Sequence, residues 1–194
     1  KKRGWSPDDV ASAIETDPDI EPRNRVFHAL ALKSYREYER LLEEESAMDF
    51  DDLLTLATLR VMEDGDRAAI NIGRGEVVRV ADLRWILLDE YQDFSELYYR
   101  MLNAILEVNP GIRVVAVGDD WQAINGFAGA QLTFFKDFGV HFSDSGVANV
   151  STNYRSEPVI VKAGNLLMKS RGQPARAYRK GTGEILIRPI DRLF

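Results

Sequence analysis

The hydrophobic positions in the first part of the chain follow a helical spacing. From residue 24 to about residue 46, apolar or aromatic side chains recur three and four positions apart, as on one face of a helix. They are Phe27, Leu30, Ala31, Tyr35, Tyr38, Leu41 and Leu42. A second helix is predicted to start at MDFDDLL, with Asp49 as its N-cap and further acids in its first turn. The proline- and acid-rich residues ahead of both predict a short helix and an extended connection.

The middle of the chain alternates apolar runs with a helical pattern. The runs are RWILLDE (84–90) and IRVVAVGDD (112–120), and the helical pattern extends from Ser95 to Val108. Continuous apolar runs of this kind are typical of parallel strands that are covered on both faces. The pattern therefore predicts a strand, helix and strand in which Asp89 and Asp119 directly follow the carboxyl ends of parallel strands. Open α/β sheets bind their ligands at that edge.

Shorter patterns predict the remaining elements. The glycines of GDRAAINIGRGE (65–76) predict a loop, and LTFFKDF (132–138) predicts a short helix. A strand is expected to lead into STNYRS, and a helix is expected from Pro158 to about Lys169, because proline suits a first helical turn. The stretch GEILIRPI (183–190) is expected to form one further strand.

Composition limits the class of protein without identifying it. A chain of 194 residues with 45% hydrophobic content suffices for one compact domain, or for one domain and part of another. The net charge of -6 argues against a uniformly basic nucleic-acid binder but allows a local basic stripe. Without cysteine there are no disulfides or thiolate metal sites, and no apolar run approaches the roughly 20 residues that span a bilayer. We expect a cytoplasmic protein, and, because the chain starts without Met, an excised piece of a longer one.

The stretch ILLDEYQDF (86–94) carries the first chemical signal. An apolar strand that ends in Asp-Glu is the Walker B pattern, in which the Asp holds Mg²⁺ and the Glu orients or deprotonates the attacking water. Taken alone, this short pattern favours structural acids that cap the next helix. His28 and His141 lie among apolar residues and are interpreted as packing residues.

Three motifs together change that interpretation. DEYQD (89–93) resembles motif II of superfamily 1 helicases of the UvrD/Rep type, VGDDWQAINGFAGA (117–130) resembles motif III, and NYRS (153–156) resembles motif IV. The stretch VGDDWQAI followed by GAQ is especially similar to the helicase IV branch. Three short motifs in the family's order rarely coincide by chance. The resemblance implies an α/β fold of the RecA-like P-loop NTPase type, a partial motor domain with a parallel sheet flanked by helices, preceded by a helical segment.

The resemblance also implies a division of the chain and an activity. Residues 1–46 would belong to an inserted subdomain or to its return to the motor core. Residues 47–156 would form the later part of the first RecA-like motor domain, and residues 157–194 the start of the second. The parent would be an ATP-dependent DNA helicase that uses ATP and Mg²⁺ to move along single-stranded DNA and to unwind duplex junctions.

The family's nucleotide-site roles transfer to matching positions. Asp89 would coordinate Mg²⁺, Glu90 would act as the catalytic base, and Gln122 would sense the γ-phosphate. Tyr154 would stack on the adenine. Arg155 would contact the γ-phosphate as an arginine finger, since a planar guanidinium binds phosphate oxygens in a bidentate way.

The DNA-coupling roles transfer with two departures. Gln92 and Asp93 would tie motif II to motif III and to the strand-binding face, and Phe127 would be a stacking platform worth about 1–3 kcal/mol per base. Asn125 stands where most of the family has Tyr, and Ala128 stands where many members have Arg.

The chain has no GxxxxGK[ST] phosphate loop, and motifs V and VI are expected to follow outside it. We therefore expect the 194 residues alone neither to hydrolyse ATP nor to unwind DNA. Two alternatives stay open: a degenerate, non-hydrolysing helicase-like interaction module, and the motor part of an ATP-dependent helicase-nuclease.

Overall fold

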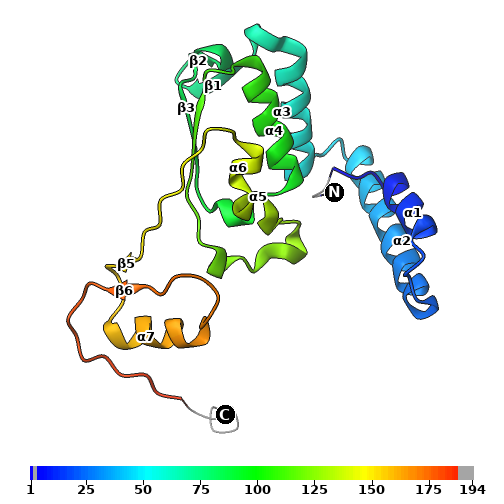
Figure 1. Cartoon of the computed structure of the whole chain (residues 1–194). Coiled ribbons are helices and arrows are strands. Elements are labelled where there is room, and N and C mark those ends of the chain that lie inside the picture. The colour runs from blue at the N-terminus through cyan, green and yellow to red at the C-terminus, as the bar shows by residue number, and fades with distance from the viewer. Residues whose placement is uncertain (2–3, 188–194) are drawn as a thin grey trace. The chain divides into compact units, whose positions relative to one another are not determined.

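The computed structural model describes Lys1 and residues 4–187 (Figure 1). It divides into two compact units, Lys1–His141 and Phe142–Phe194, each described by itself below. The described residues form helices and small two-stranded sheets. None of the described helices is both long enough and apolar enough to cross a membrane.

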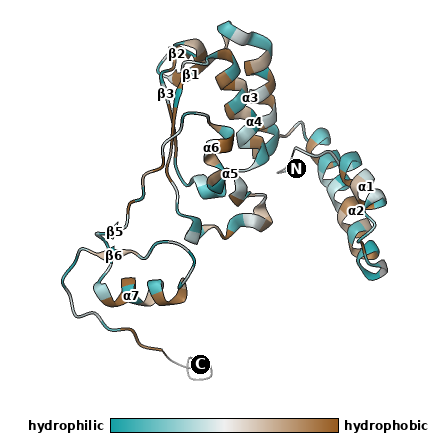
Figure 2. Ribbon diagram, viewed as in Figure 1, coloured by the Kyte–Doolittle hydropathy of each residue, from teal (hydrophilic) through white to brown (hydrophobic). Residues whose placement is uncertain are grey.

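The first unit begins with a pair of helices. Helix α1 (Pro7–Thr16) and helix α2 (Pro22–Glu44) confirm the predicted short helix and the long helix after it. Ser6 caps α1, because its hydroxyl accepts a hydrogen bond from the backbone N–H of Asp9 and the Asp9 carboxylate accepts one from the backbone N–H of Ser6. Most of α2 is hydrophilic in Figure 2.

Helix α3 (Phe50–Asp64) starts where the acids predict it. The Asp49 carboxylate accepts hydrogen bonds from the backbone N–H groups of Asp51 and Asp52, both at 2.9 Å. The ammonium of Lys1 lies 3.0 Å from Asp49 and 2.9 Å from Glu39 of α2. Burial raises the pKa of Asp49, but hydrogen bonds from Asp52, the Tyr38 hydroxyl and Lys1 outweigh burial and lower it overall. The ionised cap therefore joins α2 to the start of α3.

The predicted strand–helix–strand unit is confirmed. Strand β3 (Trp85–Leu88) and strand β4 (Arg113–Ala116) pair in parallel, with Trp85 opposite Arg113, and α4 (Glu96–Val108) connects them. Ser95 occupies the N-cap position of α4, although its side chain makes no capping hydrogen bond. Helices α3 and α4 lie side by side, and each carries both hydrophobic and hydrophilic residues, as expected when one face is buried (Figures 1 and 2). The core beside them contains Val61, Ala68, Val80 and Ala104.

The loop prediction for residues 65–76 is wrong in its second half. Strand β1 (Ala69–Gly73) and strand β2 (Glu76–Arg79) form an antiparallel hairpin. Gly73 and Gly75 have φ angles of 93° and 81°, so the glycines that suggested a loop supply the turn of a hairpin. The strands escaped prediction because all of β1 is exposed, and its few apolar residues stand among the glycines of the turn.

Short elements complete the chain. The predicted helix at 132–138 is divided into α5 (Leu132–Lys136) and α6 (Phe138–His141). In the second unit, β5 (Thr152–Asn153) and β6 (Arg176–Ala177) pair in parallel, and α7 (Pro158–Leu167) begins at the predicted proline. Residues 183–187 are not a strand, contrary to prediction, and the rest of that predicted strand, 188–190, lies outside the described residues.

Candidate functional site

The two acids of motif II lie in a sharp turn at the end of β3. Glu90 has φ 50° and ψ 43°, the left-handed region that residues other than glycine rarely adopt. The backbone N–H of Glu90 donates to the Asp89 carboxylate at 2.9 Å. Both side chains are exposed, and residues Tyr91–Asp93 follow as one 3-10 turn. Because such a conformation costs about 1–3 kcal/mol, the turn is a strained feature of the kind that gathers at functional sites.

Gln92 joins the ends of the two parallel strands. Its side chain is only 2% exposed. Its amide N–H donates to a Glu90 carboxylate oxygen at 2.6 Å, and its amide oxygen accepts from the backbone N–H of Asp119 at 2.9 Å. A buried amide is tolerated when both of its ends are paired. Gln92 therefore holds the carboxylate of Glu90 in a fixed relation to the start of motif III.

Gly118 makes room for this bridge, a role that the sequence reasoning missed. A Cβ atom at this position would lie 2.6 Å from the Gln92 amide oxygen and 2.8 Å from the ring of Phe135. No larger residue fits without displacing Gln92. The only signal in the sequence is a glycine directly after the apolar run of β4.

Gln122 reaches the same network through Asp119. The Asp119 carboxylate accepts from the Gln122 amide at 2.8 Å and from the backbone N–H of Trp121 at 3.0 Å. The sequence placed Asp119 at a strand end without giving it a role. In the structure its backbone contacts Gln92 and its side chain contacts Gln122, so motif III is connected to motif II at this residue.

A second connection lies further along motif III. The Asn125 amide donates to the Asp93 carboxylate at 2.7 Å, and the other carboxylate oxygen of Asp93 is buried without a hydrogen-bond partner in the described part of the chain. The backbone N–H of Gln131 donates to the carbonyl of Phe94 at 2.9 Å. Between these two ties Phe127 is 91% exposed. The turn that carries Phe127 is therefore held at both ends, to Asp93 of motif II and to Phe94 directly after that motif.

Tyr91 anchors the motif II turn in the core. It is 1% exposed, and its ring centroid lies 4.6 Å from that of Phe94 and 5.6 Å from that of Phe138. Burial raises the pKa of Tyr91 to about 12. The sequence reasoning gave this aromatic position no function, and the structure assigns it a packing role.

Motif IV lies in the second unit, and its backbone is held by Asn153. The Asn153 side-chain oxygen accepts from the backbone N–H of Arg155 at 3.0 Å and from that of Ser156 at 2.8 Å. Tyr154 is 63% exposed, and the Arg155 side chain is also exposed. The structure thus brings the predicted site residues of motifs II and III together in the first unit, whereas Tyr154 and Arg155 belong to the second.

Asp89 suits a magnesium ion whose remaining ligands are waters and phosphate oxygens. No group of three or more His, Cys, Asp or Glu side chains within residues 1 and 4–187 is arranged to hold a metal. Asp89 presents a hard carboxylate oxygen at the strand end, and Mg²⁺ is commonly bound by one or two carboxylates together with waters and phosphate oxygens. Asp89 therefore fits the donor type that the metal requires.

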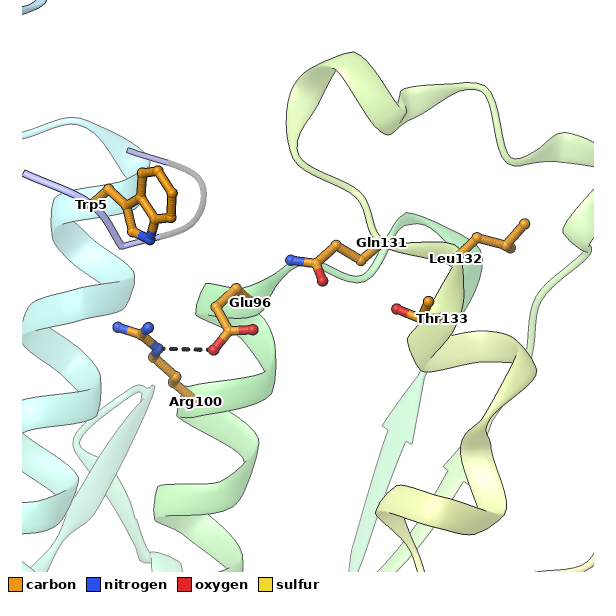
Figure 3. A pocket seen from close by; sticks show the side chains of 6 residues that line it. All are labelled: Trp5, Glu96, Arg100, Gln131, Leu132 and Thr133. Carbon is orange, nitrogen blue, oxygen red and sulfur yellow. Dashed lines mark hydrogen bonds and ion pairs between the residues drawn. The ribbon is translucent and has the colours of Figure 1, made fainter. Parts of the chain in front are cut away.

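A hollow near the end of motif III lies outside the predicted site (Figure 3). Its volume is about 490 Å³, and Glu96 and Arg100 form an ion pair at 3.2 Å in its wall. Trp5 and Gln131 also line it, and the Gln131 side chain extends toward Glu96 in Figure 3. None of the predicted site residues lines this hollow.

Both histidines pack as predicted. His28 lines an apolar groove between α1 and α2, and its Nδ1 is buried. His141 Nδ1 lies 3.1 Å from the Tyr99 hydroxyl, and its ring packs on those of Tyr99 and Phe134.

Comparison with known proteins gives one family and several similar proteins. Residues 1–143 match the family model described as the UvrD/REP helicase N-terminal domain. DNA helicase IV of Escherichia coli (strain K12) is 29% identical over 165 residues, which is 84% of this chain and 22% of that protein.

Two further relatives give similar values. The ATP-dependent DNA helicase UvrD2 of Mycobacterium tuberculosis (strain ATCC 25618 / H37Rv) is 32% identical over 154 residues, covering 77% of this chain and 21% of the relative. The putative ATP-dependent DNA helicase YjcD of Bacillus subtilis (strain 168) is 27% identical over 154 residues, covering 79% of this chain and 19% of the relative. The chain thus spans about a fifth of the length of the curated relatives it matches.

Proposed function

The chain belongs to the UvrD/REP helicase family, and from that premise we propose that it forms part of the motor of an ATP-dependent DNA helicase. Residues 47–156 would be the later part of the first RecA-like domain, residues 1–46 a helical segment ahead of it, and residues 157–194 the start of the second. The intact protein would couple hydrolysis of Mg-ATP to movement along single-stranded DNA and to separation of duplex junctions. The parallel pair β3–β4, with α4 as its connection, supports the RecA-like part of this proposal.

The Gln92 bridge is the observation that carries the proposal. An acid that only capped a helix would accept hydrogen bonds from backbone N–H groups of the first helical turn, as Asp49 does, and one that only kept a strand end soluble would need no partner beyond water. Here a buried amide holds the carboxylate of Glu90 and, at its other end, the backbone of Asp119. Burying an amide costs free energy unless both ends are paired, so this arrangement is specific to these two partners.

The acids would divide the chemistry between them. Asp89 would hold Mg²⁺, which would offset charge on the phosphate oxygens when bound. Glu90 would accept the proton of the attacking water, with its carboxylate oriented by the Gln92 amide. Gln122 would respond to the γ-phosphate, and its hydrogen bond to Asp119 would pass that response to the strand end.

The second unit would contact the adenine base and would supply the arginine finger for the γ-phosphate. Tyr154 would stack on the adenine, and Arg155 would contact the γ-phosphate, where a guanidinium offsets the charge that develops during transfer. Asn153 supports both roles, because it fixes the backbone of the turn while the Tyr154 and Arg155 side chains stay exposed to a ligand.

The DNA side of the motor would lie on the turn that carries Phe127. Its exposed ring would stack on a base without reading sequence. Asp93 and Asn125 would hold this turn against motif II. A change at the nucleotide would then reach the DNA through two hydrogen-bonded connections, one at Gln92 and one at Asp93.

The proposal is tested by DNA-stimulated ATP hydrolysis of the full reading frame that contains this chain. Glu90→Gln is expected to lower kcat by about a hundredfold or more, because it removes the base and keeps the shape. Arg155→Ala is expected to lower kcat by about a thousandfold. Glu107→Gln, at an exposed position of α4, is the matched control and should leave kcat unchanged. Wild-type rates in the Glu90 and Arg155 variants would refute the assignment.

A non-hydrolysing interaction module is the second candidate. It is favoured by the absence of a phosphate loop from these 194 residues and by Asn125 and Ala128 at motif III positions where the resemblance expects Tyr and Arg. A full reading frame that binds single-stranded DNA, but whose ATP turnover equals that of its Glu90→Gln variant, would establish this candidate instead.

A further inference from the structure

Two tyrosines that are distant in sequence form a pair on the second unit. Strand β5 pairs with β6 so that Asn153 lies opposite Ala177, and a tyrosine directly follows each strand, Tyr154 after β5 and Tyr178 after β6. The backbone N–H of Tyr178 donates to the carbonyl of Asn153 at 2.9 Å. The ring centroids of Tyr154 and Tyr178 lie 4.8 Å apart, with their planes tilted by 41°.

This pair is exposed, unlike the aromatic cluster around Tyr91. Tyr154 is 63% exposed and Tyr178 is 66% exposed, so the pair is not part of a closed core. Arg155 follows one ring in the chain and Arg179 follows the other, and Arg179 lies 3.3 Å from Glu157. Two exposed rings, each followed in the chain by an arginine, match the chemistry of a nucleotide, which offers a flat base and negatively charged phosphates.

We propose that Tyr178 is a positioning residue for Tyr154: it covers one side of the Tyr154 ring and fixes its orientation, so that the other side receives a purine base. This inference rests on the adenine-stacking role proposed for Tyr154. A ring that is already held before the base arrives loses less conformational freedom on binding, and affinity rises accordingly. Tyr178 acts through the Tyr154 ring and needs no contact with the nucleotide.

The main competing explanation is that the two rings only stabilise the pairing of β5 with β6. In that case, losing Tyr178 would lower the stability of the second unit and reduce kcat by reducing the amount of folded enzyme, while KM for ATP would stay unchanged. A positioning role predicts instead that KM rises with kcat unchanged, and that Tyr178→Ala adds nothing once the Tyr154 ring is removed. The division of the effect between KM and kcat therefore separates the two explanations.

The experiment measures KM for ATP and kcat in the full reading frame with Tyr154→Ala, Tyr178→Ala, Tyr178→Phe, Tyr178→Leu and the double alanine variant. Tyr178→Ala and Tyr178→Leu are expected to raise KM by about three- to tenfold, the range of an aromatic pair, with kcat unchanged. Tyr178→Phe should keep the wild-type KM, because the ring is retained. The double variant should match Tyr154→Ala alone.

Three outcomes would overturn the inference: one rejects the role of Tyr178, one rejects its dependence on Tyr154, and one rejects the adenine contact itself. An unchanged KM in Tyr178→Leu, while Tyr154→Ala raises KM, would remove the role of Tyr178 and leave that of Tyr154. Independent, multiplying effects in the double variant would reject the dependence on Tyr154. No change of KM in Tyr154→Ala would reject the proposed adenine contact, and the inference with it.

Discussion

The contacts that hold motifs II and III differ in kind from those that hold motif IV. In the first unit the functional side chains contact one another: Gln92 is buried between Glu90 and Asp119, and Asn125 holds Asp93. In the second unit the Asn153 side-chain oxygen accepts hydrogen bonds from backbone N–H groups, and the side chains of Tyr154 and Arg155 stay exposed. The first arrangement is preorganised by contacts between the functional side chains. In the second, the Tyr154 ring packs on the exposed ring of Tyr178, and the exposed Arg155 side chain must still be ordered by a ligand.

This difference has a consequence for catalysis. A base that must be aligned with a water molecule gains from fixed geometry before the substrate arrives. A stacking ring and a finger arginine gain from being available to a nucleotide that also contacts other parts of the protein. The two kinds of contact in the structure therefore match the two kinds of task proposed for them.

The largest expected effect comes from filling the space that Gly118 leaves. Gly118→Ala should displace the Gln92 side chain and destabilise the first unit by about 1–3 kcal/mol, because the new Cβ would overlap with Gln92 and Phe135. Urea unfolding measures the change. Gly126→Ala is the matched control, since nothing lies within 4 Å of its added Cβ. Equal stability of the two variants would show that the Gln92 bridge does not need this space.

A smaller effect is expected in the second unit. Asn153→Ala removes the acceptor of two backbone N–H groups and should cost about 1 kcal/mol, similar to the loss of a helix cap. The amide hydrogens of Arg155 and Ser156 should then exchange faster with solvent. Asn149→Ala, at an exposed position of the same unit, serves as the control. Unchanged exchange at both amides would mean that Asn153 does not hold the turn.

The smallest effect on stability is expected at Asn125. Asn125→Ala removes one hydrogen bond to Asp93 and should cost about 0.5–1 kcal/mol, because both residues are only partly buried and water can replace the lost amide. Its clearer result should be on DNA, because the turn that carries Phe127 loses one of its two ties. We expect weaker binding of single-stranded DNA by the full reading frame with an unchanged KM for ATP. A rise in KM with unchanged DNA binding would instead place Asn125 on the nucleotide side.

The sequence predicted the elements whose signals are local. Continuous apolar runs predicted β3 and β4, and the acids at the start of α3 predicted its cap, because both signals lie within a few residues of the element. The hairpin β1–β2 was missed because its first strand is exposed throughout and its glycines resemble those of a loop. Apolar runs predict strands that are buried, so they give no signal for an exposed strand such as β1.

The contacts of the site were less predictable than its residues. The motifs indicated Glu90, Gln92 and Gln122, but not that Gln92 bridges to the backbone of Asp119, 27 positions along the chain. The partnership of Tyr154 with Tyr178 likewise depends on the pairing of β5 with β6. Such contacts arise from tertiary structure, and a single sequence contains no local pattern for them.

The most direct test of the account measures how strongly single-stranded DNA stimulates ATP hydrolysis when Gln92 is replaced. In the full reading frame, Gln92→Leu keeps the approximate volume of the side chain but breaks both hydrogen bonds that join Glu90 to Asp119. We predict that the ratio of the rates with and without DNA falls by about tenfold or more, since one lost charge-assisted bond is worth about 1.5–3 kcal/mol. A Gln92→Leu variant that DNA stimulates as strongly as the wild type would contradict the account.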